Sequence, residues 1–143
     1  MPRRVADERR DVHPQGLIDT SVVNDLEHLD PEQLPNELAV SALTMAELAA
    51  GPHATTDSAE RAARQDRLQR AEATFDPLPF DTAAARAYGR IYAAIAATRR
   101  KARVPRAVDL LIAATALAAN LPLITRNAND FRGIADLVHI IAV

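Results

Sequence analysis

The stretch PRAVDLLIAATALAANLPLIT, residues 105–125, decides the fold. Between Arg106 and Asn120 nearly every residue is apolar, which predicts a helix buried on all sides. Pro122 to Thr125 predicts a short buried strand directly after it. The stretch therefore indicates a helix that leads straight into a strand, with both elements inside a core.

The same alternation extends along most of the chain. Short apolar strands are expected at residues 16–19, 38–43, 75–80, 122–125 and 137–142. Short apolar strands that alternate with helices are typical of a parallel sheet covered on both faces. We predict an α/β fold, a three-layer α/β/α sandwich with a mainly parallel central sheet, formed by residues 16–143. Residues 1–15 are expected to be a flexible, charged N-terminal extension.

The bulk composition is that of one ordinary globular domain: 143 residues, 48% hydrophobic and 25% charged. The absence of cysteine excludes disulfides and cysteine-ligated zinc. The first fifteen residues lack the apolar segment of a signal peptide, and the longest apolar stretch, residues 107–119, is too short to span a membrane. We therefore expect no membrane association and a cytoplasmic location.

Four acids lie beside apolar segments: Asp19, Glu47, Asp109 and Asp130. Carboxylates at such positions are costly to desolvate unless a cation meets them. Asp19 and residues 125–130 directly follow expected strands, and sites in parallel sheets lie beyond the carboxyl ends of the strands. If the acids converge there, their oxygens suit Mg²⁺ or Mn²⁺ and phosphate-ester chemistry.

Each acid also has a purely structural interpretation. Asp19 could cap the helix that follows it, and Thr44-x-x-Glu47 predicts a capping box. Asp109 is harder to explain in this way, because a helix dipole contributes only ~0.3–1 kcal/mol. Desolvating an unpaired charge costs several kcal/mol. Asp109 therefore needs a cation, and no basic residue inside its helix is expected to face it.

Five bases fall within eight residues: Arg99, Arg100, Lys101, Arg103 and Arg106. They could complement a helix C-terminus and continue into an exposed loop, or form a phosphate-contacting rim beside the acids. The net charge of −2 gives the whole surface no attraction for nucleic acid. The histidines lack zinc-ligand spacing, and neither a phosphate-binding loop nor a nucleophile elbow is present. Acids with a bound metal are the chemistry that remains.

Four segments, taken in order, resemble the PIN-domain ribonucleases and among them the VapC toxins of bacterial toxin–antitoxin pairs. They are LIDTSV (17–22), MAEL (45–48), VDLLIAATA (108–116) and LITRNANDF (123–131). The resemblance extends from residue 16 to the C-terminus. It implies a PIN fold and an endoribonuclease that depends on Mg²⁺ or Mn²⁺ and cleaves RNA with metal-activated water.

The resemblance also implies site residues. Asp19, Glu47 and Asp109 match the acidic triad of the family. Family members often carry a fourth acid where this chain has Asn127, which leaves Asp130 as the nearest carboxylate, acting directly, through water or not at all. The residues implied to hydrogen-bond ligands, water or substrate are Thr20, Ser21, Thr125 and Asn127.

A cognate VapB-like antitoxin, whose C-terminal tail lies across the groove, and a homodimer are further implications of the resemblance. Two other functions stay open. One is a phosphohydrolase with Asp19 as nucleophile, although Ser21 stands where such enzymes place a second Asp. The other is a catalytically inactive PIN-like binding or scaffold module, which the loss of an acid at Asn127 keeps open. Stabilisation by a divalent ion would count against the scaffold.

Overall fold

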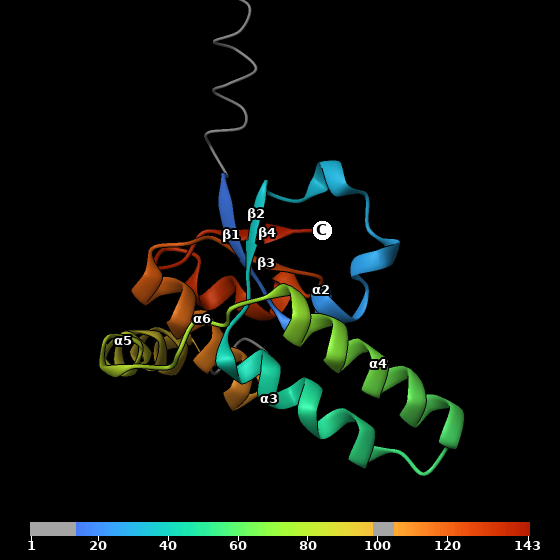
Figure 1. Cartoon of the computed structure of the whole chain (residues 1–143). Helices are drawn as coiled ribbons and strands as arrows, with labels where there is room; N and C mark the ends of the chain where they lie inside the picture. The colour runs from blue at the N-terminus through green and yellow to red at the C-terminus, as the bar shows by residue number, and fades with distance from the viewer. Residues whose placement is uncertain (1–13, 99–104) are drawn as a thin grey trace, which may run out of the picture.

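The computed structural model describes residues 14–98 and 105–143, and a parallel four-stranded sheet forms the centre of this part (Figure 1). The strands in spatial order are β2 (Glu37–Ala39), β1 (Gln15–Ile18), β3 (Leu123–Thr125) and β4 (Ile140–Ala142). Every neighbouring pair is parallel, so all four strands end at the same edge. The predicted parallel sheet is confirmed.

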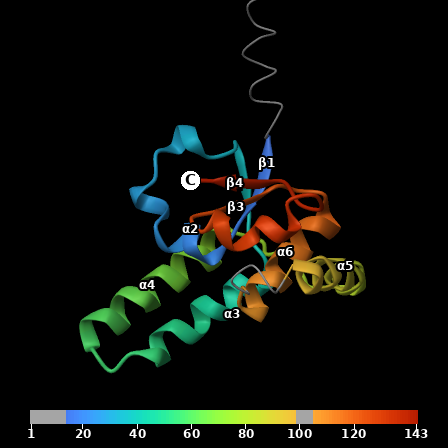
Figure 2. The same ribbon diagram turned by 180° about the vertical axis from the view of Figure 1, so that it is seen from behind.

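Helices cover both faces of the sheet. The α-helices are α2 (Thr20–Asn24), α3 (Ala42–Ala50), α4 (Ser58–Thr74), α5 (Thr82–Thr98) and α6 (Ala107–Ala119). Short 3₁₀ helices are η1 (Leu26–His28), η2 (Pro31–Gln33), η3 (Gly51–Ala54) and η4 (Ala128–Ile134). Figure 2 shows α4 and α5 on opposite sides of the molecule.

Two apolar clusters, one on each face of the sheet, form the core. Leu17 and Leu123 pack with α5, α6 and η4, whereas Ile18 and Ile124 pack with α2, α3 and α4. Neighbouring strand residues point to opposite faces, so each strand contributes to both clusters. This arrangement confirms the predicted three layers. The middle of α6 is buried, as its uniformly apolar sequence predicted.

Local side-chain chemistry sets several helix ends. The carboxylate of Asp57 accepts a hydrogen bond from the N–H of Glu60 at 2.8 Å and begins α4. Asp81 does the same for Ala84 at 3.0 Å, at the start of α5. α6 ends at Asn120, whose φ of 58° and ψ of 44° lie in the left-handed region that asparagine tolerates.

Several boundaries differ from the prediction. The strand expected at residues 38–43 is Glu37–Ala39, because α3 already begins at Ala42, and the strand expected at residues 137–142 begins at Ile140. The strand expected at residues 75–80 is only a single bridge between Leu78 and Ser41. The residues on both sides of Leu78 are prolines, which cannot donate to a ladder of hydrogen bonds. β1 begins at Gln15, which pairs with Glu37, so Gln15 belongs to the sheet and not to the predicted extension. Residues 1–13 of that extension lie outside the described residues.

None of the helices in the described part of the chain combines the length and the hydropathy that a bilayer span requires.

Candidate functional site

Asp19 lies where β1 ends, at the carboxyl edge of the sheet. Ile18 is in register with Ile124, and the N–H of Asp19 donates to the carbonyl of Ile124 at 3.1 Å. The Asp19 carboxylate caps α2 by accepting from the N–H of Val22 at 3.2 Å. Asp19 also lines a groove and is only 5% exposed. The capping role and a place in the groove therefore coexist in one side chain.

Two hydroxyl groups tie Asp19 to the loop after β3. The hydroxyl of Ser21 donates to Asp19 Oδ1 at 2.5 Å and accepts from the N–H of Arg126 at 3.1 Å. Thr125 is fully buried, and its Oγ1 accepts from the N–H of Asn127 at 3.0 Å. The loop from residue 125 to residue 127 is thus anchored on the two hydroxyls that surround Asp19.

The surroundings of Asp19 make its carboxyl harder to ionise than a carboxyl in water. Burial raises the pKa of Asp19 above its usual value of 3.8. Hydrogen bonds from Ser21, Thr125 and the N–H of Val22 lower the pKa of Asp19, and the nearby charge of Asp109 raises it. Burial prevails, so an ionised Asp19 is stabilised by any cation that approaches it.

Glu47 does not form the predicted capping box. The N-cap of α3 is Ser41, whose hydroxyl accepts from the N–H of Thr44 at 3.1 Å, so Thr44 already lies inside the helix. Glu47 lies in the second turn and accepts a short hydrogen bond from the hydroxyl of Thr20. Thr20 has one hydroxyl proton, so the hydroxyl of Thr44, 3.1 Å away, donates to Thr20. This contact links α2 to α3 and orients Glu47.

Asp109 is met by a cation from the start of its own helix. Arg106 is the N-cap residue of α6. Its Nη2 lies 3.1 Å from Asp109 Oδ1 and 3.3 Å from Glu47 Oε2, and its Nε lies 3.3 Å from Asp109 Oδ2. The hydrogen bond with Asp109 raises the pKa of Arg106 above its usual value. The expectation that no basic residue inside the helix predicted at residues 106–120 faces Asp109 was wrong, because Arg106, the first residue of that range, bridges two of the predicted acids.

The groove has a volume of about 670 Å³. Its polar lining includes Asp19, Thr20, Ser21, Arg106, Asp109, Arg126, Asn127, Asn129 and Asp130. Glu47 lines an adjoining hollow and accepts hydrogen bonds from two residues of the groove, Thr20 and Arg106. Asp130 lies in the first turn of η4, with its N–H bonded to the carbonyl of Asn127 at 3.0 Å. The structure thus brings all four predicted acids to one edge of the sheet.

The predicted basic rim is divided. Arg106 lies within the groove, ion-paired to the acids. Arg99, Arg100, Lys101 and Arg103 lie outside the described residues. The role predicted for these four residues stays a prediction.

The donor chemistry of the carboxylates suits a divalent ion. Within residues 14–98 and 105–143, no three His, Asp or Glu side chains form a ready-made metal cluster. Glu47 and Asp109 nevertheless converge on one cationic nitrogen of Arg106, so both carboxylates already face a positive charge. Oxygen donors of this kind suit Mg²⁺ and Mn²⁺.

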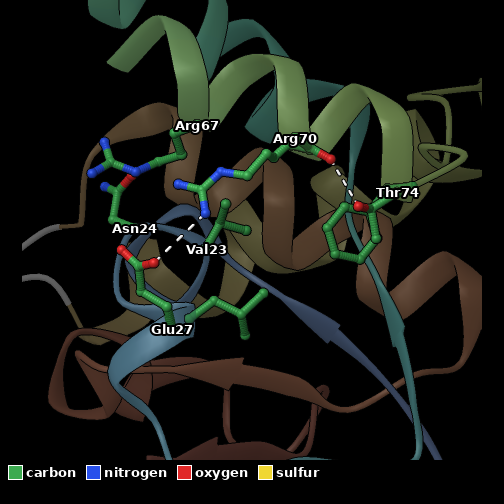
Figure 3. Close-up of a pocket in the computed structure, with 9 residues that line it drawn as sticks. Val23, Asn24, Glu27, Arg67, Arg70 and Thr74 are labelled. Carbon is green, nitrogen blue, oxygen red and sulfur yellow. Dashed lines mark hydrogen bonds and ion pairs between the residues drawn. The ribbon is translucent and has the colours of Figure 1, made fainter. Parts of the chain in front are cut away.

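A second pocket of about 240 Å³ lies between α4 and the segment formed by α2 and η1 (Figure 3). Its apolar lining is formed by Val23, Leu26, Ala71 and Phe75. Figure 3 shows Arg70 reaching Glu27 at the rim, an exposed ion pair 3.6 Å long. This pocket is lined by one carboxylate, Glu27, whereas Asp19, Asp109 and Asp130 line the acidic groove, so the groove is the candidate site for chemistry.

Comparison with known proteins agrees with this architecture. Residues 17–137 match the PIN domain family. The chain belongs to this family. This PIN domain is 36% identical over 119 residues to Ribonuclease VapC5 of Mycobacterium tuberculosis, a match that covers 81% of this chain and 84% of the relative. The resemblance to VapC proteins that the four sequence segments indicated is thereby confirmed.

Solved structures match the same fold. The crystal structure of VapBC-5 from M. tuberculosis matches with a TM-score of 0.77 and 36% identity, covering 91% of this chain and 99% of that one. VapBC-1 from nontypeable Haemophilus influenzae matches with a TM-score of 0.65 and 26% identity, covering 87% and 95% of the two chains. The α/β/α architecture is therefore that of VapC-type PIN domains.

Proposed function

We propose that this PIN domain is an endoribonuclease that depends on Mg²⁺ or Mn²⁺, the toxin of a type II toxin–antitoxin pair acting in the cytoplasm. The observation that carries the proposal is the convergence of Asp19, Glu47 and Asp109 from three separate elements, with two of them already bridged by one cation. The 36% identity to Ribonuclease VapC5 supports the choice of RNA as substrate.

Asp19, Glu47 and Asp109 would hold the ion, and Asp130 would contribute from the groove wall, directly or through water. The chemistry supplied by a divalent ion at this position is a lowered pKa for a bound water and neutralisation of phosphate charge. Hydroxyl groups orient two of these three carboxylates in advance. Ser21 holds the carboxylate of Asp19, and Thr20 holds that of Glu47.

The reaction is hydrolysis of one phosphodiester bond. The oxygen of a water molecule bonds to phosphorus, the bond from phosphorus to O3′ breaks, and a proton ends on O3′. The products are a 5′-phosphate and a 3′-hydroxyl. Asn127 and Arg126 line the groove beside the acids, where a bound RNA strand would contact them.

The basic segment would attract the RNA backbone to a groove rich in carboxylates. Arg99, Arg100, Lys101 and Arg103 add four positive charges just before Pro105. Replacing three of these residues by Gln should weaken RNA binding and reduce the salt slope by up to about 0.7 per lost contact on a single strand. Binding with an unchanged salt dependence would remove this part of the proposal.

We also propose that a VapB-like antitoxin neutralises this chain and that the chain forms a homodimer. VapBC-5 is a member of the VapBC family of toxin–antitoxin systems, and this chain covers 99% of the chain it matches there. Co-purification of the chain with the protein encoded beside its gene, followed by light scattering, tests both points. A monomer that no such protein inhibits would contradict them.

The nuclease itself is tested by incubating purified protein with total bacterial RNA in Mg²⁺, in Mn²⁺ and in EDTA. Wild type should yield discrete fragments with 5′-phosphates only when metal is present, and Asp109→Asn should yield none. Asp76→Asn is the matched control, because Asp76 is exposed and does not line the groove. Fragments that persist in Asp109→Asn would indicate a contaminant. Absence of cleavage, together with absence of stabilisation by Mn²⁺, would favour an inactive scaffold.

A further inference from the structure

The cation that lies between the carboxylates in this structure is Arg106. Its Nη2 is 3.3 Å from Glu47 Oε2 and 3.1 Å from Asp109 Oδ1. An Mg²⁺ ion bound to the same two oxygens needs metal–oxygen distances of about 2.0–2.1 Å. The guanidinium nitrogen and the ion therefore cannot both occupy the space between Glu47 and Asp109.

We propose that Arg106 is a built-in competitor of the divalent ion: it bridges Glu47 and Asp109 in the metal-free protein and leaves when an ion binds between them. This inference rests on the proposed metal site. It accounts for the finding that no three acids in the described part of the chain form a ready-made cluster. The carboxylates are arranged around a guanidinium, which is larger than a metal ion.

The position of Arg106 permits the exchange. Its side chain is 68% exposed, whereas those of Glu47 and Asp109 are 21% and 19% exposed. The guanidinium therefore lies on the solvent side of the pair. The backbone of Arg106 begins α6 after Pro105, and the Arg106 side chain makes no capping hydrogen bond. Rotation of side-chain torsions alone removes the guanidinium, so the helix does not have to move.

The second arginine of the groove offers a matched control. Arg126 lines the same groove, but its Nε pairs with Asp25 Oδ2 at 3.3 Å and not with a site acid. Replacing either arginine removes one positive charge near the acids. Only replacement of Arg106 removes a group that occupies the proposed ion position.

The test is the affinity for Mn²⁺, measured from the electron paramagnetic resonance signal of the free ion, without RNA and without turnover. Arg106→Gln should bind Mn²⁺ about 2- to 30-fold more tightly than wild type, the equivalent of ~0.4–2 kcal/mol for the loss of two exposed ion pairs. Arg126→Gln should stay within about twofold of wild type, because Asp25 already takes up its charge. Arg106→Lys keeps the charge but loses the planar guanidinium that contacts both carboxylates. Its gain in Mn²⁺ affinity should therefore be smaller than that of Arg106→Gln.

The outcomes separate the competitor from the metal site itself. Equal Mn²⁺ affinity in wild type and Arg106→Gln would contradict the competitor role of Arg106. Equal gains in Mn²⁺ affinity in Arg106→Gln and Arg126→Gln would contradict it too. Neither result would contradict the proposed nuclease. Failure of both wild type and Arg106→Gln to bind Mn²⁺ would overturn the proposed function and this inference together. If Arg106→Gln does not fold, as judged by its melting curve in EDTA, Arg106→Lys decides, and binding no tighter than wild type overturns the proposal.

Discussion

Replacing Asp19 by Asn should stabilise the metal-free protein while abolishing RNA cleavage. Asp19 is 5% exposed, burial is the main cause of its raised pKa, and the like charge of Asp109 raises the pKa further. Asn is an equally good N-cap and can keep the hydrogen bond from Val22. The substitution therefore removes a buried charge without removing the cap.

The expected gain in the free energy of unfolding at neutral pH in EDTA is about 0.5–2 kcal/mol, the size common for relief of one unfavourable feature. For a domain of this length, about 1 kcal/mol corresponds to ~3–5 °C in Tm. The free energy of unfolding of Asp19→Ala should be about 1 kcal/mol lower than that of Asp19→Asn, because alanine cannot cap the helix. Asp19→Asn should gain less stability than wild type from added Mn²⁺, since one proposed ligand is weakened.

The stabilisation should depend on pH. The folded-state pKa of Asp19 lies above the unfolded value of 3.8, so the folded protein binds more protons than the unfolded chain in the interval between the two values. The contribution of protonated Asp19 to the free energy of unfolding of the wild type is therefore fully present below the unfolded pKa. It is lost as the pH rises through the folded pKa. The advantage of Asp19→Asn should be absent below the unfolded pKa and should grow as the pH rises through the folded pKa of Asp19. A Tm in EDTA that falls in Asp19→Asn, or a gain that does not change with pH, would refute the reasoning.

Three further substitutions test the packing. Gly89→Ala should raise stability by about 0.5–1 kcal/mol, because Gly89 lies inside α5 and a Cβ there meets nothing within 4 Å; a lower Tm would show that α5 is covered at this point. Gly16→Ala should lower stability by about 1–3 kcal/mol, since its Cβ would lie 2.2 Å from Ile124 Cδ1, and urea unfolding measures the loss. Thr20→Val should lower the free energy of unfolding by about 1–3 kcal/mol, because Glu47 loses the hydrogen bond from the Thr20 hydroxyl. It should also weaken Mn²⁺ binding, and an unchanged Mn²⁺ affinity would show that Thr20 does not contribute to the site.

Much of the fold could be predicted because single segments carried the necessary information. The uniformly apolar α6 and the short strand after it indicated a buried crossover and a parallel sheet, and the structure has both. The strand expected around Leu78 was reduced to one bridge, because flanking prolines limit hydrogen bonding there. Apolar content alone did not separate a strand from a bridge.

The site was less accessible to sequence reasoning because its contacts are distant along the chain. Thr44 and Glu47 match a capping box locally, but Ser41 bridges to Leu78 and takes the N-cap position of α3. That choice depends on tertiary pairing.

The contact between Arg106 and Asp109 spans three residues and could have been proposed from helical spacing. The contact between Arg106 and Glu47 spans 59 residues and exists because α3 packs near α6. No local pattern in the sequence indicates it.

The central claim, that Asp19, Glu47 and Asp109 hold a divalent ion, is tested most directly by anomalous diffraction from crystals grown with Mn²⁺. We expect an Mn²⁺ peak within metal–oxygen bonding distance of carboxylate oxygens of Asp19, Glu47 and Asp109, with the Arg106 side chain turned out of the groove. Arg106 still bridging both carboxylates in crystals at saturating Mn²⁺, with no Mn²⁺ peak in the groove, would contradict it.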